Sequence, residues 1–312
     1  MRHSLVVGSF TPSVYLDVAR TGGYLEAHDV AVQEVPVTSS PAQFQALIDG
    51  DLDVGLTSPD NVLAYRFSPT NPLARLADAR IVSTVDRGLG LSLWLRPGPE
   101  ALTAQTVPEL LRGATVAVDV ASSGFALAMY ALIESWGVTR DEYELVTLGS
   151  TPHRLEALVE GGCDATMLNA GNDLRAGQAG CRRVSSMAES GPPYVGTVVC
   201  VVGARRLEAA TALAEALRAT ARDIVAGHQD ETAIRAAQSL LHLPRDLAQQ
   251  FVEMLKDPAQ GLITSDAVDV DGLRTVAAFR RRFLPELVDG PHSPDVLDAA
   301  FDRSSGLLVF SP

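Results

Sequence analysis

Short apolar runs alternate with amphipathic segments over the first two thirds of the chain. Apolar runs bounded by turn residues predict strands, whereas apolar residues at i, i+3 and i+4 predict helices. After Gly203 the pattern is helical to the end, including residues 294–303. Strands that alternate with helices are typical of an α/β fold with parallel sheets. The predicted strands are residues 5–7, 30–37, 54–56, 79–86, 91–95, 115–120, 144–148, 165–168, 181–187 and 194–203.

One helix–turn–strand unit occurs twice. Residues 40–61 match residues 151–172, with Pro41 opposite Pro152. In each copy a Ser or Thr followed by Pro starts a helix, a glycine ends it, and a short apolar strand runs into small polar residues. Chance similarity is the alternative, because caps and turns recur in unrelated units. We interpret the repeat as two similar α/β lobes that face each other across a central cleft.

Two stretches are expected to carry the chain between these lobes. Gly88 and Gly90 interrupt the apolar pattern within residues 85–90, and glycines inside a strand pattern suggest a bend or a crossing. The apolar run at residues 194–203 is the candidate for the return passage. Both repeat copies in one sheet would contradict the two-lobe interpretation.

Composition and charge exclude several classes of function. The chain has 312 residues, 46% of them hydrophobic, and a formal net charge of −13, which is ordinary for a globular protein of two domains. An acidic chain is unsuited to nucleic acid or anionic membranes, and no apolar run has the length of a membrane span. The three cysteines and six histidines form no metal-ligand spacing. We therefore expect no nucleic acid, no membrane insertion, no metal and no cofactor, in a monomer or a dimer.

The start of the chain bears on its location. Met1 to His3 lead directly into the first predicted strand, without an apolar export signal. As written, the sequence favours a cytoplasmic protein. A periplasmic or extracellular protein would require that a signal had been trimmed.

The loops that follow the predicted strands are rich in hydroxyl and amide groups. Several precede a helix, where backbone N–H groups and the helix dipole can hold one carboxylate, sulfonate or phosphate without an arginine. For each single Ser or Thr, plain N-capping is the alternative. The candidate ligand-binding residues are Ser9, Phe10, Thr11, Thr38, Ser39, Ser58, Asn61, Arg87, Ser122, Ser123, Asn169, Asn172 and Tyr194.

Charged and aromatic candidates have two interpretations each. Arg87 could pair with a ligand anion, and Asp86 could bind an amine or act as a base; the alternative is an Asp86–Arg87 or interlobe ion pair. Tyr15, Phe10 and Tyr194 could form aromatic walls of the site or belong to the core. No G-x-S-x-G, HExxH or Walker-type motif is present, so catalytic residues are not identified.

The same loops predict the chemistry of the ligand. They offer many neutral donors and acceptors and few cations beyond Arg87. We therefore expect a small, mostly neutral organic molecule with an apolar body and at most one anionic group. The anionic end should lie near Ser122 and Ser123, with Asn169 facing them as a neutral partner.

Three segments resemble a known family. Residues 22–25 (GGYL), 44–56 (FQALIDGDLDVGL) and 261–283 (GLITSDAVDVDGLRTVAAFRRRF) are similar to type II periplasmic binding proteins. They resemble the branch shared by aliphatic-sulfonate and taurine binding proteins and the fungal thiamine-pyrimidine synthase. The N-terminal loop departs from the thiamine-pyrimidine enzymes, because it lacks their histidine and cysteine features.

The resemblance implies a fold and a function. The fold is α/β, a two-lobe periplasmic-binding-protein type II fold with two Rossmann-like lobes, a central cleft and a C-terminal helical segment. Residues 1–87 and 201–312 would form lobe one and residues 88–200 lobe two, with hinge closure as the expected motion. The implied function is to bind a small organic solute for an ABC permease. The alternative is a cytoplasmic enzyme on the same fold, such as a decarboxylase, a dehydratase or lyase, or a biosynthetic enzyme for a cofactor or secondary metabolite.

Overall fold

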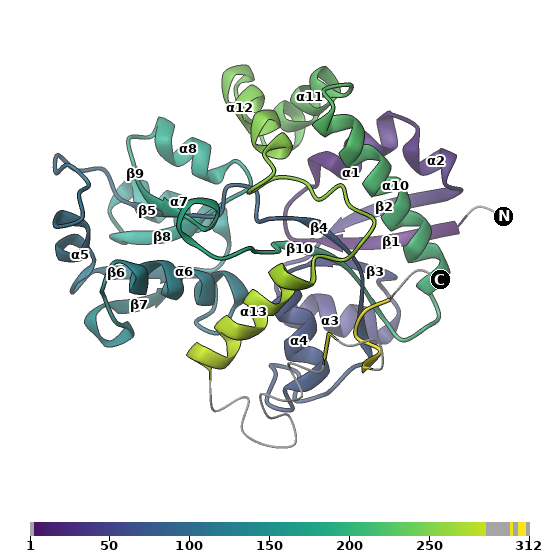
Figure 1. Ribbon diagram of the computed structural model, residues 1–312, viewed down its shortest axis with the longest axis horizontal. Coiled ribbons are helices and arrows are strands. Elements are labelled where there is room, and N and C mark those ends of the chain that lie inside the picture. Colours follow the sequence, from purple (N-terminus) through teal and green to yellow (C-terminus); the bar gives the residue numbers. More distant parts are fainter. Residues whose placement is uncertain (1–2, 285–299, 302–304, 310–312) are drawn as a thin grey trace.

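Two five-stranded mixed sheets form the framework of the computed structural model, which describes residues 3–284, 300–301 and 305–309 (Figure 1). The first sheet has the order β2-β1-β3-β10-β4 and the second the order β7-β6-β8-β5-β9. The first sheet contains β1 (His3–Ser9), β2 (Val30–Pro36), β3 (Val54–Thr57), β4 (Ala79–Asp86) and β10 (Thr197–Val202). The second contains β5 (Ser92–Leu95), β6 (Thr115–Val118), β7 (Glu144–Thr147), β8 (Ala165–Leu168) and β9 (Arg182–Ser186).

The two sheets are built alike. β1 pairs in parallel with β2 and β3, and β6 pairs in parallel with β7 and β8. In each sheet one strand runs antiparallel to both neighbours: β10 in the first sheet and β5 in the second. These are the strands by which the chain enters each sheet from the other.

The repeat lies where the two-lobe interpretation places it. Residues 40–61 form α3 (Ser40–Asp49), β3 and the start of α4 (Pro59–Phe67). Residues 151–172 form α7 (Thr151–Glu160) and β8, and end at the start of α8 (Asn172–Gln178). β3 and β8 are the central strands of different sheets, and every residue of both is buried. The predicted α/β fold with two sheets is confirmed.

Helices cover both faces of the first sheet (Figure 1). Buried residues of β1 pack with α1 (Val14–Thr21), α10 (Leu207–Val225), α11 (Asp230–Leu240) and α12 (Arg245–Lys256) in one apolar cluster. α3 and α4 belong to a second cluster, which continues into the second lobe. α2 (Tyr24–Ala27) contacts α1 and α10.

The second lobe carries shorter helices, and the C-terminal helix joins it to the first. Its helices are α5 (Thr106–Leu111), α6 (Gly124–Ser135), α7, α8 and α9 (Met187–Ser190), with a 3₁₀ turn at Arg140–Glu142. α13 (Val270–Phe283) contacts α4 of the first lobe and α6 of the second, and α12 contacts α8. Figure 1 shows α13 between α6 and α4. The expected helix at residues 294–303 falls largely outside the described residues.

The chain passes between the sheets twice. Residues 87–91 join β4 to β5, close to the expected passage at residues 85–90. The return lies at residues 187–196. The expectation of residues 194–203 holds only for residues 194–196 and is wrong for the rest, because β10 pairs wholly within the first sheet. A lobe boundary after residue 200 would divide β10. The division of the chain into lobes stays a proposal, now with the return passage ahead of β10.

Candidate functional site

Four loops follow β1, β3, β6 and β8, and each leads directly into a helix. We call residues 9–13, 57–61, 119–124 and 169–172 the strand-end loops, although each range also includes the last residue of its strand or the first residues of its helix. The helices that follow are α1, α4, α6 and α8. Ligands of open α/β sheets bind outside the carboxyl ends of the strands, where helix starts present free N–H groups. The strand-end loops are therefore the candidate site.

Two of these loops, one from each lobe, touch at their helix starts. A Cβ added to Gly124 at the start of α6 would lie 2.7 Å from Cβ of Asp60 and 2.8 Å from Oγ of Ser58. Only a glycine permits this approach. The contact brings Ser58 beside the segment that contains Ser122 and Ser123.

A buried ion pair fixes the first-lobe side of this contact. Nη1 of Arg280 on α13 donates to Oδ1 of Asp60 at 2.8 Å, and both side chains are buried. Three consecutive arginines near the end of a helix are typical of a solvated face, where they interact favourably with the helix dipole. Arg280 departs from this pattern and is only 4% exposed. Its partner is 220 residues away, so no local pattern indicated the pair.

Carboxylates of the protein accept hydrogen bonds at two of the helix starts. Oε1 of Glu34 accepts from Oγ of Ser9 (2.6 Å) and from the backbone N–H of Ser13 (3.0 Å) at the start of α1. Oδ1 of Asp119 accepts from Oγ of Ser123 (2.5 Å) at the start of α6. In this arrangement the hydroxyl protons of Ser9 and Ser123 point to the chain's own carboxylates.

Capping accounts for several candidate serines. Ser39, Ser58 and Ser123 cap α3, α4 and α6 by accepting from backbone N–H groups. Their hydroxyl oxygens are used in this way because the first N–H groups of a helix have no partner inside it. A role of these serines in ligand binding stays a prediction.

The amide candidates hold one strand-end loop against the first passage. Nδ2 of Asn169 donates to the backbone oxygen of Gly88 (3.2 Å), and the N–H of Ala170 donates to that of Leu89 (2.8 Å). Nδ2 of Asn172 donates to the backbone oxygen of Asn169 (3.2 Å). In the first lobe, Nδ2 of Asn61 donates to Oγ1 of Thr57 (3.0 Å).

Two strand-end loops, one from each lobe, expose a large apolar side chain. Phe10 follows β1 and is 45% exposed, and Val120 follows β6 and is 52% exposed. Thr11 and Ser122 are half-buried in the same two loops, whereas Thr38 is exposed at the end of β2. Exposed apolar groups beside helix starts suit a ligand with an apolar body.

Arg87 does not have the partner that the sequence suggested. It forms an ion pair with Asp269, which caps α13, and its Nε donates to the backbone oxygen of Pro258 (3.0 Å). The alternative of an Asp86–Arg87 pair is wrong, because Oδ1 of Asp86 accepts from the backbone N–H of Gly88 (2.8 Å). Arg87 is thus engaged within the protein and is a weak candidate for a ligand anion.

Asp86 and Tyr194 are buried near the two passages. Asp86 is 1% exposed, and burial raises the pKa of its carboxyl to about 6. Tyr194 is buried against Phe279, and its hydroxyl has no hydrogen-bond partner among the described residues. Burial, with the carboxylates of Asp60 and Asp86, raises the pKa of Tyr194.

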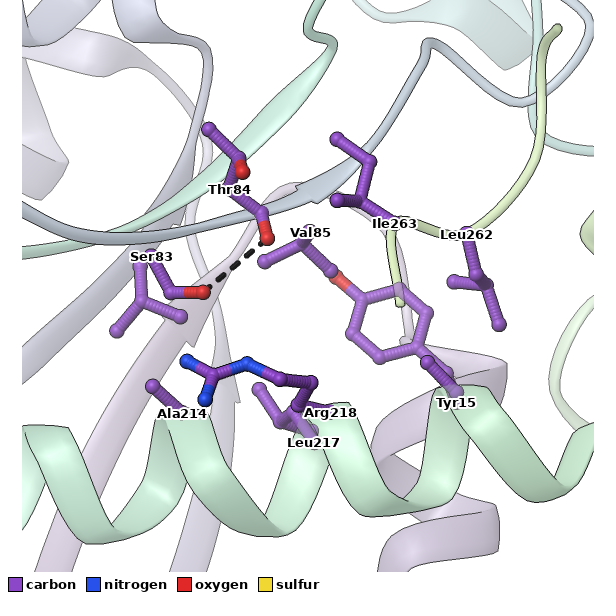
Figure 2. A pocket seen from close by; sticks show the side chains of 11 residues that line it. Tyr15, Ser83, Thr84, Val85, Ala214, Leu217, Arg218, Leu262 and Ile263 are labelled. Carbon is purple, nitrogen blue, oxygen red and sulfur yellow. Dashed lines mark hydrogen bonds between the residues drawn. The ribbon is translucent and has the colours of Figure 1, made fainter. Parts of the chain in front are cut away.

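A cavity of about 10 Å³ borders β4 and α10 (Figure 2). Tyr15, Thr84 and Arg218 line it, and Oγ of Ser83 donates to the backbone oxygen of Thr84 at 3.1 Å. This volume holds about one water molecule and is far below that of an organic solute. Tyr15 therefore belongs to the core at this cavity.

Comparisons with known proteins agree with this architecture. The family model described as "ABC transporter, phosphonate, periplasmic substrate-binding protein" matches residues 18–240. No curated protein matches the chain. The alkanesulfonate-binding protein SsuA from Xanthomonas axonopodis pv. citri, solved with bound MOPS, is 15% identical with a TM-score of 0.67, over 91% of this chain and 95% of that chain.

Two further solved structures are similar. The periplasmic aliphatic sulphonate-binding protein SsuA from Escherichia coli is 18% identical with a TM-score of 0.66, over 94% of this chain and 89% of that chain. A Candida albicans gene product with the generic periplasmic-binding-protein fold is 15% identical with a TM-score of 0.67, over 98% of this chain and 96% of that chain. Identities this low show the fold. The matched family model covers well over half of the residues, and the chain therefore belongs to the phosphonate family of ABC-transporter periplasmic substrate-binding proteins.

Proposed function

We propose that this chain binds a small organic solute at the strand-end loops, closes its lobes on it outside the cytoplasm, and passes it to an ABC permease. Family membership makes the chain a substrate-binding protein and favours this function over an enzyme on the same fold. The expected cytoplasmic location is not supported, since the family is periplasmic. Among the described helices, none combines the length and apolarity that a bilayer span requires.

The observation that carries the proposal is the pairing of exposed apolar groups with helix starts on loops of both lobes. Phe10 precedes α1, and Val120 precedes α6. An apolar ligand body that covers both side chains would gain about 25 cal/mol per Å² of apolar surface removed from water. Because the two residues belong to different lobes, that gain favours closure.

The charges of the loops argue for a ligand with little negative charge. Glu34 and Asp119 lie at the starts of α1 and α6, and Asp60 lies in the first turn of α4. Arg87 and Arg280 are already paired with carboxylates. Similar proteins are described as binding sulfonates or phosphonates. For this chain we propose at most one anionic group on an apolar body, so an alkyl sulfonate fits better than a bisphosphonate.

A panel of solutes tests the proposal. Hexanesulfonate, hexylphosphonate, hexanamide and methylenebisphosphonate are compared by thermal shift and then by calorimetric titration. We expect binding from compounds with a hexyl chain and no binding of the bisphosphonate. A response confined to the bisphosphonate would contradict the proposed ligand class.

A pair of variants locates the site. Replacing Phe10 by Ala should weaken binding of the best hexyl compound by about 1–2 kcal/mol, because a phenyl group is lost from the contact. Leu76→Ala is the matched control, since Leu76 is 44% exposed outside the strand-end loops. Equal losses in both variants would place the ligand elsewhere.

A further inference from the structure

A groove of about 660 Å³ lies outside the strand-end loops, between the second lobe and α12. One wall comes from β5, α8, β9 and α9, and the other from α12 and the residues up to Gln260. None of the thirteen candidate ligand residues lines it. Its volume falls within the range of about 300–1,000 Å³ that is typical of small-molecule sites. We call it the α12 groove.

Both walls of the α12 groove contain large apolar side chains. Trp94 lies there 7% exposed, with its indole N–H donated to Oγ of Ser92 at 2.9 Å. Leu174 lines the second-lobe wall, and Leu247 and Met254 line the α12 wall. Such a surface suits an aromatic or aliphatic body.

The groove is also strongly acidic. Asp173, Glu189, Asp246 and Asp257 line it, against one cation, Arg183. Nη2 of Arg183 is bonded to Oε1 of Glu189 at 2.8 Å, so that pair is neutral. Three carboxylates remain without a cationic partner in the groove.

Asp173 sits deepest among these carboxylates. It is 4% exposed, and its Oδ1 accepts from the backbone N–H of Gly171 at 2.9 Å. A Cβ atom added to Gly90 would lie only 2.7 Å from Oδ2 of Asp173. The carboxylate is therefore close to the backbone of the first passage between the lobes. No Lys, Arg or His of the described part of the chain forms an ion pair with it. A buried carboxylate in this position is costly unless it gains a cation.

We propose that the α12 groove is a second binding site, which takes a small organic cation with its ammonium group beside Asp173 and its apolar body against Trp94. Asp246 and Asp257 add to the attraction from the α12 side. The net charge of −13 favours the approach of cations in general. The proposal does not depend on which solute binds at the strand-end loops.

The protonation state of Asp173 fits this assignment. Burial raises the pKa of its carboxyl to about 7, against the opposing effect of hydrogen bonds from the backbone N–H groups of Gly171, Asp173 and Leu174 and, more weakly, of the Arg183 charge. The other charged groups that line the groove are Glu189, Asp246 and Asp257. A bound ammonium group stabilises the ionised carboxylate, so cation affinity should rise with pH through neutrality.

The test uses 2-phenylethylammonium, with 2-phenylethanol as the neutral analogue and 3-phenylpropionate as the anionic one. A Trp136→Phe background leaves Trp94 as the reporter of fluorescence, since the chain has two tryptophans. Calorimetry provides a second readout. We expect quenching and heat from the ammonium compound at millimolar concentration, and none from the analogues.

Variants of α12 assign the binding to the groove. Gln250 lines the groove and Gln249 does not, although both are exposed on the same helix. Gln250→Trp should abolish binding of 2-phenylethylammonium by filling the groove, and Gln249→Trp should leave it within about twofold of the parent chain. Asp173→Asn should weaken it at least about tenfold, because a charge-assisted hydrogen bond is lost. Asp246→Asn provides a surface variant if Asp173→Asn fails to fold, and should weaken binding measurably.

Three results would overturn the proposal. The first is equal binding of 2-phenylethanol and the ammonium compound, and the second is unchanged affinity in Gln250→Trp. The third is the absence of both heat and quenching at millimolar 2-phenylethylammonium. None of these outcomes affects the test of the hexyl compounds, whose binding is compared between the parent chain and the Phe10→Ala variant. Failure of one proposal is therefore distinguishable from failure of the other.

Discussion

Asp86 and Asp173 are buried carboxylates with raised pKa values, about 6 and about 7. Burial is the largest cause for both, because a low-dielectric environment disfavours the charged form. Each accepts a backbone hydrogen bond, from Gly88 and from Gly171, which compensates only in part. Both residues adjoin the first passage between the lobes, so the passage carries two groups that change charge near neutral pH.

The pH dependence of stability should report these groups. An unfolded aspartate has a pKa of about 3.9, so between about pH 4 and pH 7 the folded chain binds more protons than the unfolded chain. Stability should therefore fall as pH rises through that window. Asp86→Asn should reduce the fall by about 2–3 kcal/mol, since one pKa unit corresponds to about 1.4 kcal/mol. Urea denaturation across the window measures it, with exposed Asp246→Asn as the control. Parallel profiles for Asp86→Asn and the parent chain would show that Asp86 is not responsible.

At the scale of elements, α13 joins the two lobes. Its Arg280 pairs with Asp60 of α4, and its Arg282 pairs with Glu134 of α6 at 2.7 Å. Phe283 lies edge-on to Tyr130 of α6, with ring centroids 5.5 Å apart. Buried residues of α13 also belong to the apolar cluster that continues from the first lobe into the second. Relative motion of the lobes must therefore be accommodated around α13.

The Asp60–Arg280 pair should matter far more than an exposed pair on the same helix. Arg280→Met leaves Asp60 buried without a cation, and we expect a loss of about 3–5 kcal/mol in the free energy of unfolding. The Asp60→Asn, Arg280→Met double variant should recover much of this loss, because no buried charge remains. Arg274→Met is the control, since the Arg274–Asp271 pair is exposed and should contribute at most about 1 kcal/mol. Denaturant titration gives all three values. A similar loss in Arg280→Met and Arg274→Met would contradict the argument.

The elements were largely predictable because their signals are local. The Ser-Pro start and Gly end of residues 40–50 correspond to a Thr-Pro start and Gly end at residues 151–161, and both segments form the expected helices. The return passage was misplaced because Tyr194 and Val195 are as buried as β10 itself, and an apolar run reports burial rather than strand pairing. The pairs Arg87–Asp269 and Asp60–Arg280 were missed because their partners lie 182 and 220 residues apart. The hydroxyl-rich loops indicated where the helices start. They could not show that the carboxylates of Glu34 and Asp119 accept hydrogen bonds at the starts of α1 and α6.

At the scale of the whole molecule, the two passages and α13 connect the lobes and therefore limit how the lobes can move when they close. With the best hexyl compound at saturation, small-angle scattering should show a smaller radius of gyration than without ligand, because the ligand favours contact between the lobes. Phe10→Ala at the same ligand concentration is the control and should shift less. An unchanged radius for the parent chain, with binding confirmed by calorimetry, would mean that a closed pocket already exists without ligand.

The order of the strands along the chain has a consequence for synthesis on the ribosome. Among the strands of the described residues, β4 pairs only with β10, which follows every strand of the second sheet in the chain. The other edge of β4 forms isolated bridges with Leu262 and Leu308. The second sheet comes from one continuous segment, residues 92–186. A nascent chain that has emerged as far as residue 186 can complete the second sheet, while β3 and β4 still await the strand that lies between them. The lobe that begins the chain is thus the last to be finished, although domains more commonly fold from the N-terminus onward.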